Sequence, residues 1–203
     1  MPPDFSALST PHLKRVMIFI DGGYFRKIVD KKFGDRANND PAIMSKALNH
    51  LISKIQQTSF APHSKSEIVR AYYYDARFPP EDPEHIKQSE YFKEIQKSIT
   101  YPFEMKYGRL VRAGKDGEKI RQKGVDVLLS VDMVVKAFLN HYDFAVLIAG
   151  DQDFLDAVRV VKDLAGKKVV GYYDPTSTSK ELIESFDYKF PILPSPFFND
   201  LRI

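Results

Sequence analysis

Short apolar runs alternate along most of the chain with longer stretches in which apolar residues recur at helical spacing. Two of the runs, RVMIFID and DFAVLIAG, show no polar alternation, which is typical of strands buried on both faces. EIVRAYYYD is rich in β-branched and aromatic residues, which favour strands. Five such runs predict strands at 15–21, 67–75, 143–150, 167–173 and 190–193.

The stretches between the runs predict helices. A short helix is expected after Gly22 and Gly23, and a longer amphipathic helix at 42–57. Further helices are expected at 80–99, 124–140, 151–166 and 179–186. The segments 103–112 and 118–122 flank the turn signal GKDG, which predicts a β-hairpin.

This alternation of strand and helix predicts an α/β domain with a mainly parallel central sheet, helices on both faces and a β-hairpin insertion. In sheets of this kind the functional site lies beyond the carboxyl ends of the strands. Residues that directly follow the runs 15–21 and 143–150 are therefore expected to share one rim, although they are far apart in the chain.

Composition narrows the class of protein. The 203 residues, 43% of them hydrophobic, suffice for one domain with one core. The sequence contains no cysteine, so disulfides and cysteine-bound metals are excluded. The first residues lack a signal-peptide pattern, and no apolar run approaches the roughly 20 residues that span a bilayer. We therefore expect a cytoplasmic protein with no membrane partner; a net charge of +3 does not by itself indicate a nucleic-acid partner.

Aspartates stand at both predicted rim positions. Asp21 ends the first run, Asp151 and Asp153 follow the run 143–150, and Asp126 and Asp132 lie on the helix 124–140. Crowded carboxylates raise each other's pKa unless a cation neutralises them, and Mg²⁺ or Mn²⁺ prefers oxygen ligands. Such an ion suits phosphoryl chemistry.

Simpler interpretations of these acids remain open. Asp21 and Asp151 could cap helices, and Asp126 could be a first-turn acid favoured by the helix dipole. Asp132 is either a boundary residue or faces the same site. The five histidines are scattered, and no serine-nucleophile, Walker or dinucleotide motif is present.

Three blocks of sequence resemble the NYN domain, a branch of the PIN-like nuclease superfamily that includes the LabA-like bacterial proteins. They are VMIFIDGGYFRK (16–27), KGVDVLLSVDMV (123–134) and VLIAGDQDFLDAVRVVKDLAGKKVVGYY (146–173). The closing SKELIESFDYKFPIL (179–193) is similar to the final helix and strand of that family. The resemblance implies an NYN domain at 15–193, with an extension at 1–14 and a tail at 194–203.

The resemblance also implies a PIN-like sheet with a Mg²⁺- or Mn²⁺-dependent ribonuclease site. Carried onto this chain, the acidic site falls on Asp21, Asp126, Asp151 and Asp153, with Asp132 as a further contributor. By this resemblance Asp21, Asp126 and Asp151 would bind the metal ion directly or through water. Asp153 would orient the attacking water or hold a second ion.

Two residues depart from the family pattern. Tyr24 stands where many members have asparagine, and Ala149 stands where serine is common before Gly-Asp. Tyr24 could hydrogen-bond a phosphate or simply pack. Neither change removes a carboxylate, so they bear on rate and substrate preference.

Positive charge gathers on the predicted hairpin, just before the helix that carries Asp126. It is a candidate surface for RNA phosphates, with single-stranded regions favoured because Tyr24 and Tyr107 could stack on unpaired bases. The alternative is an ordinary hairpin whose lysines protect its edge. The basic residues are Lys106, Arg109, Arg112, Lys115, Lys119, Arg121 and Lys123.

Other functions stay open at this stage. The chain could be a non-catalytic NYN-like module that binds RNA or a regulatory partner, or a scaffold with a structural metal. A haloacid-dehalogenase-type phosphatase would use Asp151 as a nucleophile, but that fold places its nucleophile after the first strand. The apolar segment 191–198 could cover the core or support a homo-oligomer.

Overall fold

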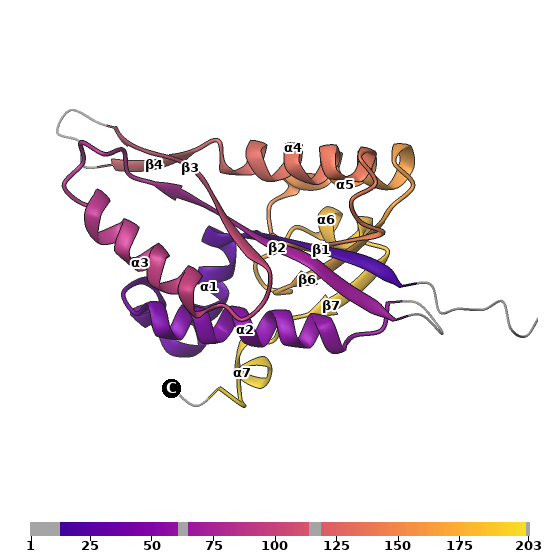
Figure 1. The fold of residues 1–203 in the computed structure, drawn as a ribbon, viewed down its shortest axis with the longest axis horizontal. Helices are drawn as coiled ribbons and strands as arrows, with labels where there is room; N and C mark the ends of the chain where they lie inside the picture. Colours follow the sequence, from indigo (N-terminus) through magenta and orange to yellow (C-terminus); the bar gives the residue numbers. More distant parts are fainter. Residues whose placement is uncertain (1–12, 61–64, 114–118, 202–203) are drawn as a thin grey trace, which may run out of the picture.

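The computed structural model describes residues 13–60, 65–113 and 119–201. Within these ranges one seven-stranded sheet runs through the molecule in the order β4-β3-β2-β1-β5-β6-β7 (Figure 1). Neighbouring strands are parallel except for the antiparallel pair β3 and β4. The strands are β1 (Lys14–Asp21), β2 (Ser66–Arg77), β3 (Phe103–Ala113), β4 (Lys119–Lys123), β5 (Phe144–Ile148), β6 (Lys168–Tyr173) and β7 (Tyr188–Pro191).

Helices cover both faces of the sheet, and Figure 1 shows α2 and α4 on opposite sides of it. The first face carries α1 (Gly22–Phe33), α2 (Pro41–Gln57), α3 (His85–Ser98) and α7 (Pro194–Phe197), with the 3-10 turn η2 (Asp35–Asn38) before α2. The second face carries α4 (Val125–Phe138), η3 (Gln152–Phe154), α5 (Leu155–Arg159), η4 (Val160–Leu164) and α6 (Lys180–Ser185). The predicted three-layer α/β fold is confirmed.

The side chains of β1 show why two cores form. Val16, Ile18 and Ile20 point into the core under α1 and α2, whereas Met17 and Phe19 point into the core under α4. All five are buried, which explains why this strand reads as one unbroken apolar run. The consecutive tyrosines of β2 divide in the same way, with Tyr73 on the first side.

Two elements differ in detail from the sequence pattern. The expected helix 151–166 consists of a 3-10 turn, one α-helical turn and a π-helical turn. The hairpin is part of the central sheet, because β3 pairs with β2 over its first half and with β4 over its second half. It therefore extends the sheet edge that leads into α4.

The described part of the C-terminal tail covers the core, which is one of the two roles that the sequence left open for the apolar segment 191–198. Phe198 is fully buried, and its ring packs 6.4 Å from that of Phe25 and 5.9 Å from that of Phe33. Lys32 donates to the side-chain oxygen of Asn199 at 3.1 Å. Ile192 and Phe198 therefore belong to the core under α1, and Phe197 and Leu201 pack against it.

None of the helices in the described ranges is long and apolar enough to cross a membrane.

Replacing Phe198 with alanine tests the role of the C-terminal segment. Because the ring is fully buried, Phe198→Ala should lower the free energy of unfolding by about 3 kcal/mol or more, measured by urea denaturation. Leu193→Ala, at a side chain that is 51% exposed, is the matched control and should cost less than about 1 kcal/mol. Equal small losses in both variants would contradict the assignment of this segment to the core.

Candidate active site

The order in which strands are added to the sheet changes side at β1. The chain adds β2 and β3 on one side of β1, then returns to place β5 on the other side and continues outward to β6 and β7. Ile20 of β1 pairs with Ile148 of β5, so the carboxyl ends of these strands lie side by side. This is the topological switch point where open α/β sheets bind ligands. The predicted shared rim is confirmed.

A cavity of about 290 Å³ opens at this point. Three of the predicted acids line it: Asp21 from the end of β1, Asp126 from the start of α4 and Asp151 from the segment after β5. The complete lining is Asp21, Gly23, Tyr24, Lys27, Gln122, Asp126, Gly150, Asp151 and Ser177.

Asp21 is both a helix cap and a member of this pocket. Its Oδ1 accepts a hydrogen bond from the Tyr24 N–H at 3.1 Å, so it caps α1 as one interpretation of the sequence suggested. Burial, with smaller contributions from the negative charges of Asp126 and Asp75, raises the pKa of Asp21 to about 6. Capping alone would not place a carboxylate among like charges.

Asp126 stands in the first turn of α4, directly after a turn in which Gly124 adopts φ 80°. Burial raises the pKa of Asp126, and so do the charges of Asp151 and Asp153. Asp151 caps η3 by accepting the Asp153 N–H at 3.0 Å. Asp153 is exposed and lies outside the cavity lining, but its effect on Asp126 places it beside the same site.

The four acids share one further property: none forms an ion pair with a lysine, arginine or histidine among the described residues. By contrast, the two fully buried aspartates, Asp75 and Asp174, and the half-buried Asp143 and Asp132 have cationic partners. These pairs are Asp75 with Arg26 at 2.7 Å, Asp143 with Arg15 at 3.0 Å, Asp174 with Lys31, and Asp132 with Lys106 and Lys136. Uncompensated charge is therefore concentrated at the switch point, as is common at functional sites.

The donor set suits a hard divalent ion in kind, because all of its ligands are carboxylate oxygens. Over the described ranges, however, no three histidine, cysteine, aspartate or glutamate side chains are grouped closely enough to hold a metal ion. Mg²⁺ usually retains several waters and needs only one or two direct carboxylates. The residues present therefore fit a largely hydrated ion rather than one chelated directly by three carboxylates.

Asp132 does not belong to this site. Its carboxylate accepts from the Tyr74 hydroxyl at 2.9 Å, contacts Lys106 and lies 3.1 Å from the Lys136 ammonium. These partners hold the pKa of Asp132 below its usual range. The expectation failed because Asp132 comes six positions after Asp126 on the helix, which turns it about 120° away.

Tyr24 is not a stacking surface for bases. It is buried, and its hydroxyl bonds to Thr178 Oγ1 at 2.6 Å and accepts the Asp174 N–H at 2.7 Å. Its ring covers Gly150, where an added Cβ would lie 2.3 Å from a ring carbon. Tyr24 therefore packs, and it fixes the loop that carries Ser177 against the pocket wall.

The predicted basic surface is only partly available. Arg112 is bound to Asp82 through two contacts of 2.6 and 3.0 Å, and Lys106 is bound to Asp132. Lys115 and the side chain of Lys119 lie outside what the structure describes. The side chains that are exposed and form no ion pair within the described part of the chain are Arg109, Arg121 and Lys123.

These cations do not point into the pocket. Side chains alternate along a strand, so Gln122, which lines the pocket, faces the opposite way from Arg121 and Lys123. Tyr107 is half-buried under the Arg77 guanidinium, 5.0 Å from its ring centre, and is not a free platform either. The ribbon thus flanks the acidic site rather than covering it.

Sequence reasoning missed three polar residues of the pocket: Lys27, Gln122 and Ser177. Lys27 is the lining residue with positive charge; it is exposed and forms no ion pair with any described residue. Lys27 could have been predicted from the sequence, because it lies on α1, the helix that Asp21 caps. The loop with Ser177 could not, because its place depends on the Tyr24 contacts.

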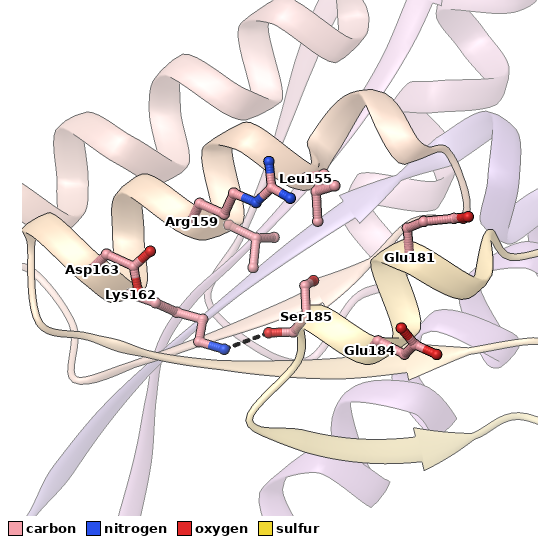
Figure 2. Close-up of a pocket in the computed structure, with 8 residues that line it drawn as sticks. Leu155, Arg159, Lys162, Asp163, Glu181, Glu184 and Ser185 are labelled. Atoms are coloured by element: carbon pink, nitrogen blue, oxygen red, sulfur yellow. Dashed lines mark hydrogen bonds between the residues drawn. The ribbon is translucent and has the colours of Figure 1, made fainter.

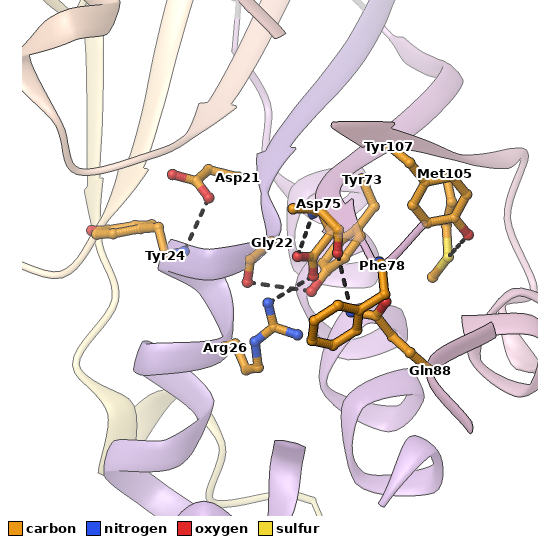
Figure 3. A network of polar contacts seen from close by, with 11 residues as sticks. Asp21, Gly22, Tyr24, Arg26, Tyr73, Asp75, Phe78, Gln88, Met105 and Tyr107 are labelled. Carbon is orange, nitrogen blue, oxygen red and sulfur yellow. Dashed lines mark hydrogen bonds and ion pairs between the residues drawn. The ribbon is translucent and has the colours of Figure 1, made fainter. Parts of the chain in front are cut away.

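A buried network supports Asp21 from behind (Figure 3). Arg26 of α1 donates to Asp75 at 2.7 Å, and the Tyr73 hydroxyl donates to the carbonyl of Gly22 at 3.3 Å. An added Cβ on Gly22 would lie 2.6 Å from the Tyr73 ring, so glycine is needed for this approach. Asp75, which the sequence did not single out, is therefore a neutralised neighbour that helps to place α1.

A second hollow of about 360 Å³ lies between α5, η4 and α6 (Figure 2). Its charged lining mixes both signs, Arg159 and Lys162 with Asp163, Glu181 and Glu184. The Lys162 ammonium already donates to the Ser185 carbonyl at 2.5 Å.

The fold and the acidic rim define a nuclease-like α/β protein of the PIN-like type. The family model for the NYN domain matches residues 15–193, and the chain belongs to this family. The predicted resemblance is confirmed.

A solved structure of a protein of unknown function from Vibrio parahaemolyticus is similar, with a TM-score of 0.63 and 22% identity over 91% of this chain and 96% of that chain. That likeness shows the fold alone. A Sir2 enzyme structure matches with a TM-score of 0.34 and 12% identity over 93% of this chain and 90% of that chain, too low to inform any argument. A search of curated proteins gave no match.

The substitution Asp21→Asn tests whether the ionised carboxylate of Asp21 destabilises the folded protein. Because the folded pKa of Asp21 is raised from 3.8 to about 6, its ionised form destabilises the fold above that range. Asparagine keeps the cap, so without divalent ions the variant should gain up to about 3 kcal/mol of unfolding free energy at pH 7.5.

The gain should shrink as pH falls from about 6 and vanish below the unfolded value of 3.8, where the carboxyl of the native residue is protonated in both states. Asp132→Asn is the matched control and should lose stability at pH 7.5, because its carboxylate is ion-paired. A loss of stability in Asp21→Asn at pH 7.5 would contradict the account.

Proposed function

We propose that this NYN protein is a Mg²⁺- or Mn²⁺-dependent ribonuclease that hydrolyses RNA phosphodiester bonds at the β1–β5 rim. The observation that carries the proposal is the set of four aspartates at the switch point that form no ion pair within the described chain, whereas the fully buried Asp75 and Asp174 have cationic partners. Carboxylates that raise each other's pKa are relieved when a cation binds between them.

Asp21, Asp126 and Asp151 would hold the ion, directly or through water. When bound, a divalent ion supplies neutralisation of the phosphodiester and lowers the pKa of water to yield a nucleophile. Asp153 is exposed beside Asp126 and would accept a hydrogen bond from the attacking water, which orients it. Lys27, on the same wall as Asp21, would bind a non-bridging phosphate oxygen.

RNA is proposed as the substrate class, with single-stranded regions favoured. Arg109, Arg121 and Lys123 form an exposed, unpaired row along the ribbon next to the acidic pocket, within the described chain. A strand whose scissile phosphate lies in the pocket would pass around the edge strand β4, and its neighbouring phosphates would meet this row on the face of the ribbon opposite Gln122. A cytoplasmic location belongs to the same proposal.

One observation favours a second candidate, a non-catalytic NYN module that binds RNA or acts as a regulator. No three potential ligands are grouped for direct chelation among the described residues. Such a module would bind RNA through the same ribbon without cutting it. Cleavage assays distinguish the two candidates.

The purified protein is incubated with labelled single-stranded RNA in Mg²⁺, Mn²⁺ or EDTA. We expect cleavage that requires the metal and falls about a hundredfold or more in Asp126→Asn and in Asp151→Asn. Asp156→Asn is the control, because that side chain is 91% exposed on the neighbouring helix α5 and should leave cleavage unchanged. RNA binding without metal-dependent cleavage in the native protein would support the non-catalytic module instead.

Lys27→Gln tests the phosphate contact. Loss of one cation from the pocket should weaken RNA binding about tenfold at low salt, and the dependence of log Kd on log salt should fall by about 0.7. Lys93→Gln on α3 removes an exposed cation far from the rim and should change neither quantity. Binding by Lys27→Gln that matches the native protein in affinity and salt dependence would remove Lys27 from the site.

A further inference from the structure

The outer face of α4 carries an exposed apolar stripe. Figure 1 shows this helix along the outside of the molecule. Six of the eleven large apolar side chains that are exposed in the described ranges lie on α4, at its C-cap Leu139 or on the adjoining turn η4. They are Val127 (66% exposed), Val131 (52%), Val135 (47%), Phe138 (58%), Leu139 (59%) and, on η4, Leu164 (70%).

The stripe is continuous. Val127, Val131 and Val135 recur every four residues, and with Phe138 and Leu139 they fall within a sector of about 120° around the helix axis. Other side chains form the inner face of α4: Val125, Leu129 and Met133 are buried against the sheet. The α4 stripe therefore has no packing role within the described chain.

The stripe also lacks charge. Of the charged residues on α4, Asp132 and Lys136 are paired with each other near Lys106, and Asp126 faces the acidic pocket. Covering the stripe would therefore desolvate no unpaired ion. Its five α4 side chains expose apolar area on the order of 500 Å², at the upper end of what a monomer usually shows.

We propose that the α4 stripe is a homodimer interface, in which α4 packs antiparallel against α4 of a second copy about a two-fold axis. A straight stripe with a four-residue repeat is self-complementary under this rotation, as a two-fold interface requires. Antiparallel packing also sets the two helix dipoles in opposite directions.

The exposed area is that of the apolar part of a dimer interface. A stable dimer buries roughly 800 Å² on each partner, about two thirds of it apolar, so the stripe would form the apolar centre of such a patch. Leu164 on η4 and the half-buried Val134 extend it at the sides. The C-terminal segment offers a smaller apolar surface, because Ile192 and Phe198 are buried and Leu193 is its one large apolar side chain that is exposed within the described chain.

The arrangement fixes distances between the two copies. With the axis between Val131 and Val135, the two Val131 Cα atoms would lie roughly 10 Å apart and the two Val127 Cα atoms roughly 20 Å apart. Asp126 precedes Val127, so the two acidic pockets would stand at opposite ends of the helix pair. Dimerisation would leave both pockets open.

Light scattering coupled to size exclusion tests the proposal on the full chain. The native protein should show about twice the monomer mass of 23.3 kDa. Val131→Glu should give the monomer mass with an unchanged circular dichroism spectrum, because the side chain is exposed and the fold does not need it. Ile86→Glu, at a position 70% exposed on α3, is the matched control and should remain dimeric.

The absence of cysteine allows a second measurement that does not depend on mass. Val131→Cys should cross-link to its copy with a short bifunctional thiol reagent, whereas Ile86→Cys should not. Spin labels on Val127→Cys should report a separation near 20 Å. A native monomer at tens of micromolar, or a dimer that survives Val131→Glu, would overturn the proposal.

A different occupant would also be visible in these experiments. If residues 1–12 of the same chain covered the stripe, the native protein would be monomeric and a chain that lacks them would become dimeric. That result would contradict the proposed interface for the full chain. None of these outcomes depends on whether the acidic pocket cleaves RNA.

Discussion

The arrangement of this protein depends on the repulsion between carboxylates that the sheet brings to one point. Because β1 and β5 are adjacent and parallel, Asp21 and Asp151 must end at the same rim, and the start of α4 adds Asp126. The fold provides no lysine or arginine within ion-pair distance of these acids in the part of the chain that is described. Burial, with smaller contributions from the neighbouring acids, raises the pKa of Asp21 to about 6, so keeping this carboxylate ionised costs folding free energy.

The surrounding structure keeps the rim in place and keeps other charges away from it. Tyr24 holds the loop that contains Ser177 through Thr178 and Asp174, and Gly150 leaves room for its ring. Behind the rim, Arg26 neutralises Asp75. Helix α4 has three sides with separate roles: its first turn presents Asp126, its inner face packs on the sheet, and its outer face is the proposed contact with a second copy.

The sequence predicted what depends on chain order and local pattern. Unbroken apolar runs identified β1 and β5, and strand order then placed Asp21 and Asp151 on one rim. It failed where a side chain's role is decided by distant partners. Asp132 is bound to Lys106 on β3, Arg112 to Asp82 and Tyr24 to Thr178, and no local pattern reveals such pairs. Lys27 was missed for the opposite reason, because an exposed lysine on a helix usually has no special role.

The central claim is that a divalent cation binds where Asp21, Asp126 and Asp151 meet. Anomalous diffraction from crystals grown with Mn²⁺ tests it most directly, because it locates the ion without reference to any activity. The account predicts a single dominant peak in the pocket, within direct or water-mediated reach of these three carboxylates. An empty pocket at millimolar Mn²⁺, or the Lys27 ammonium seated between the acids, would contradict it.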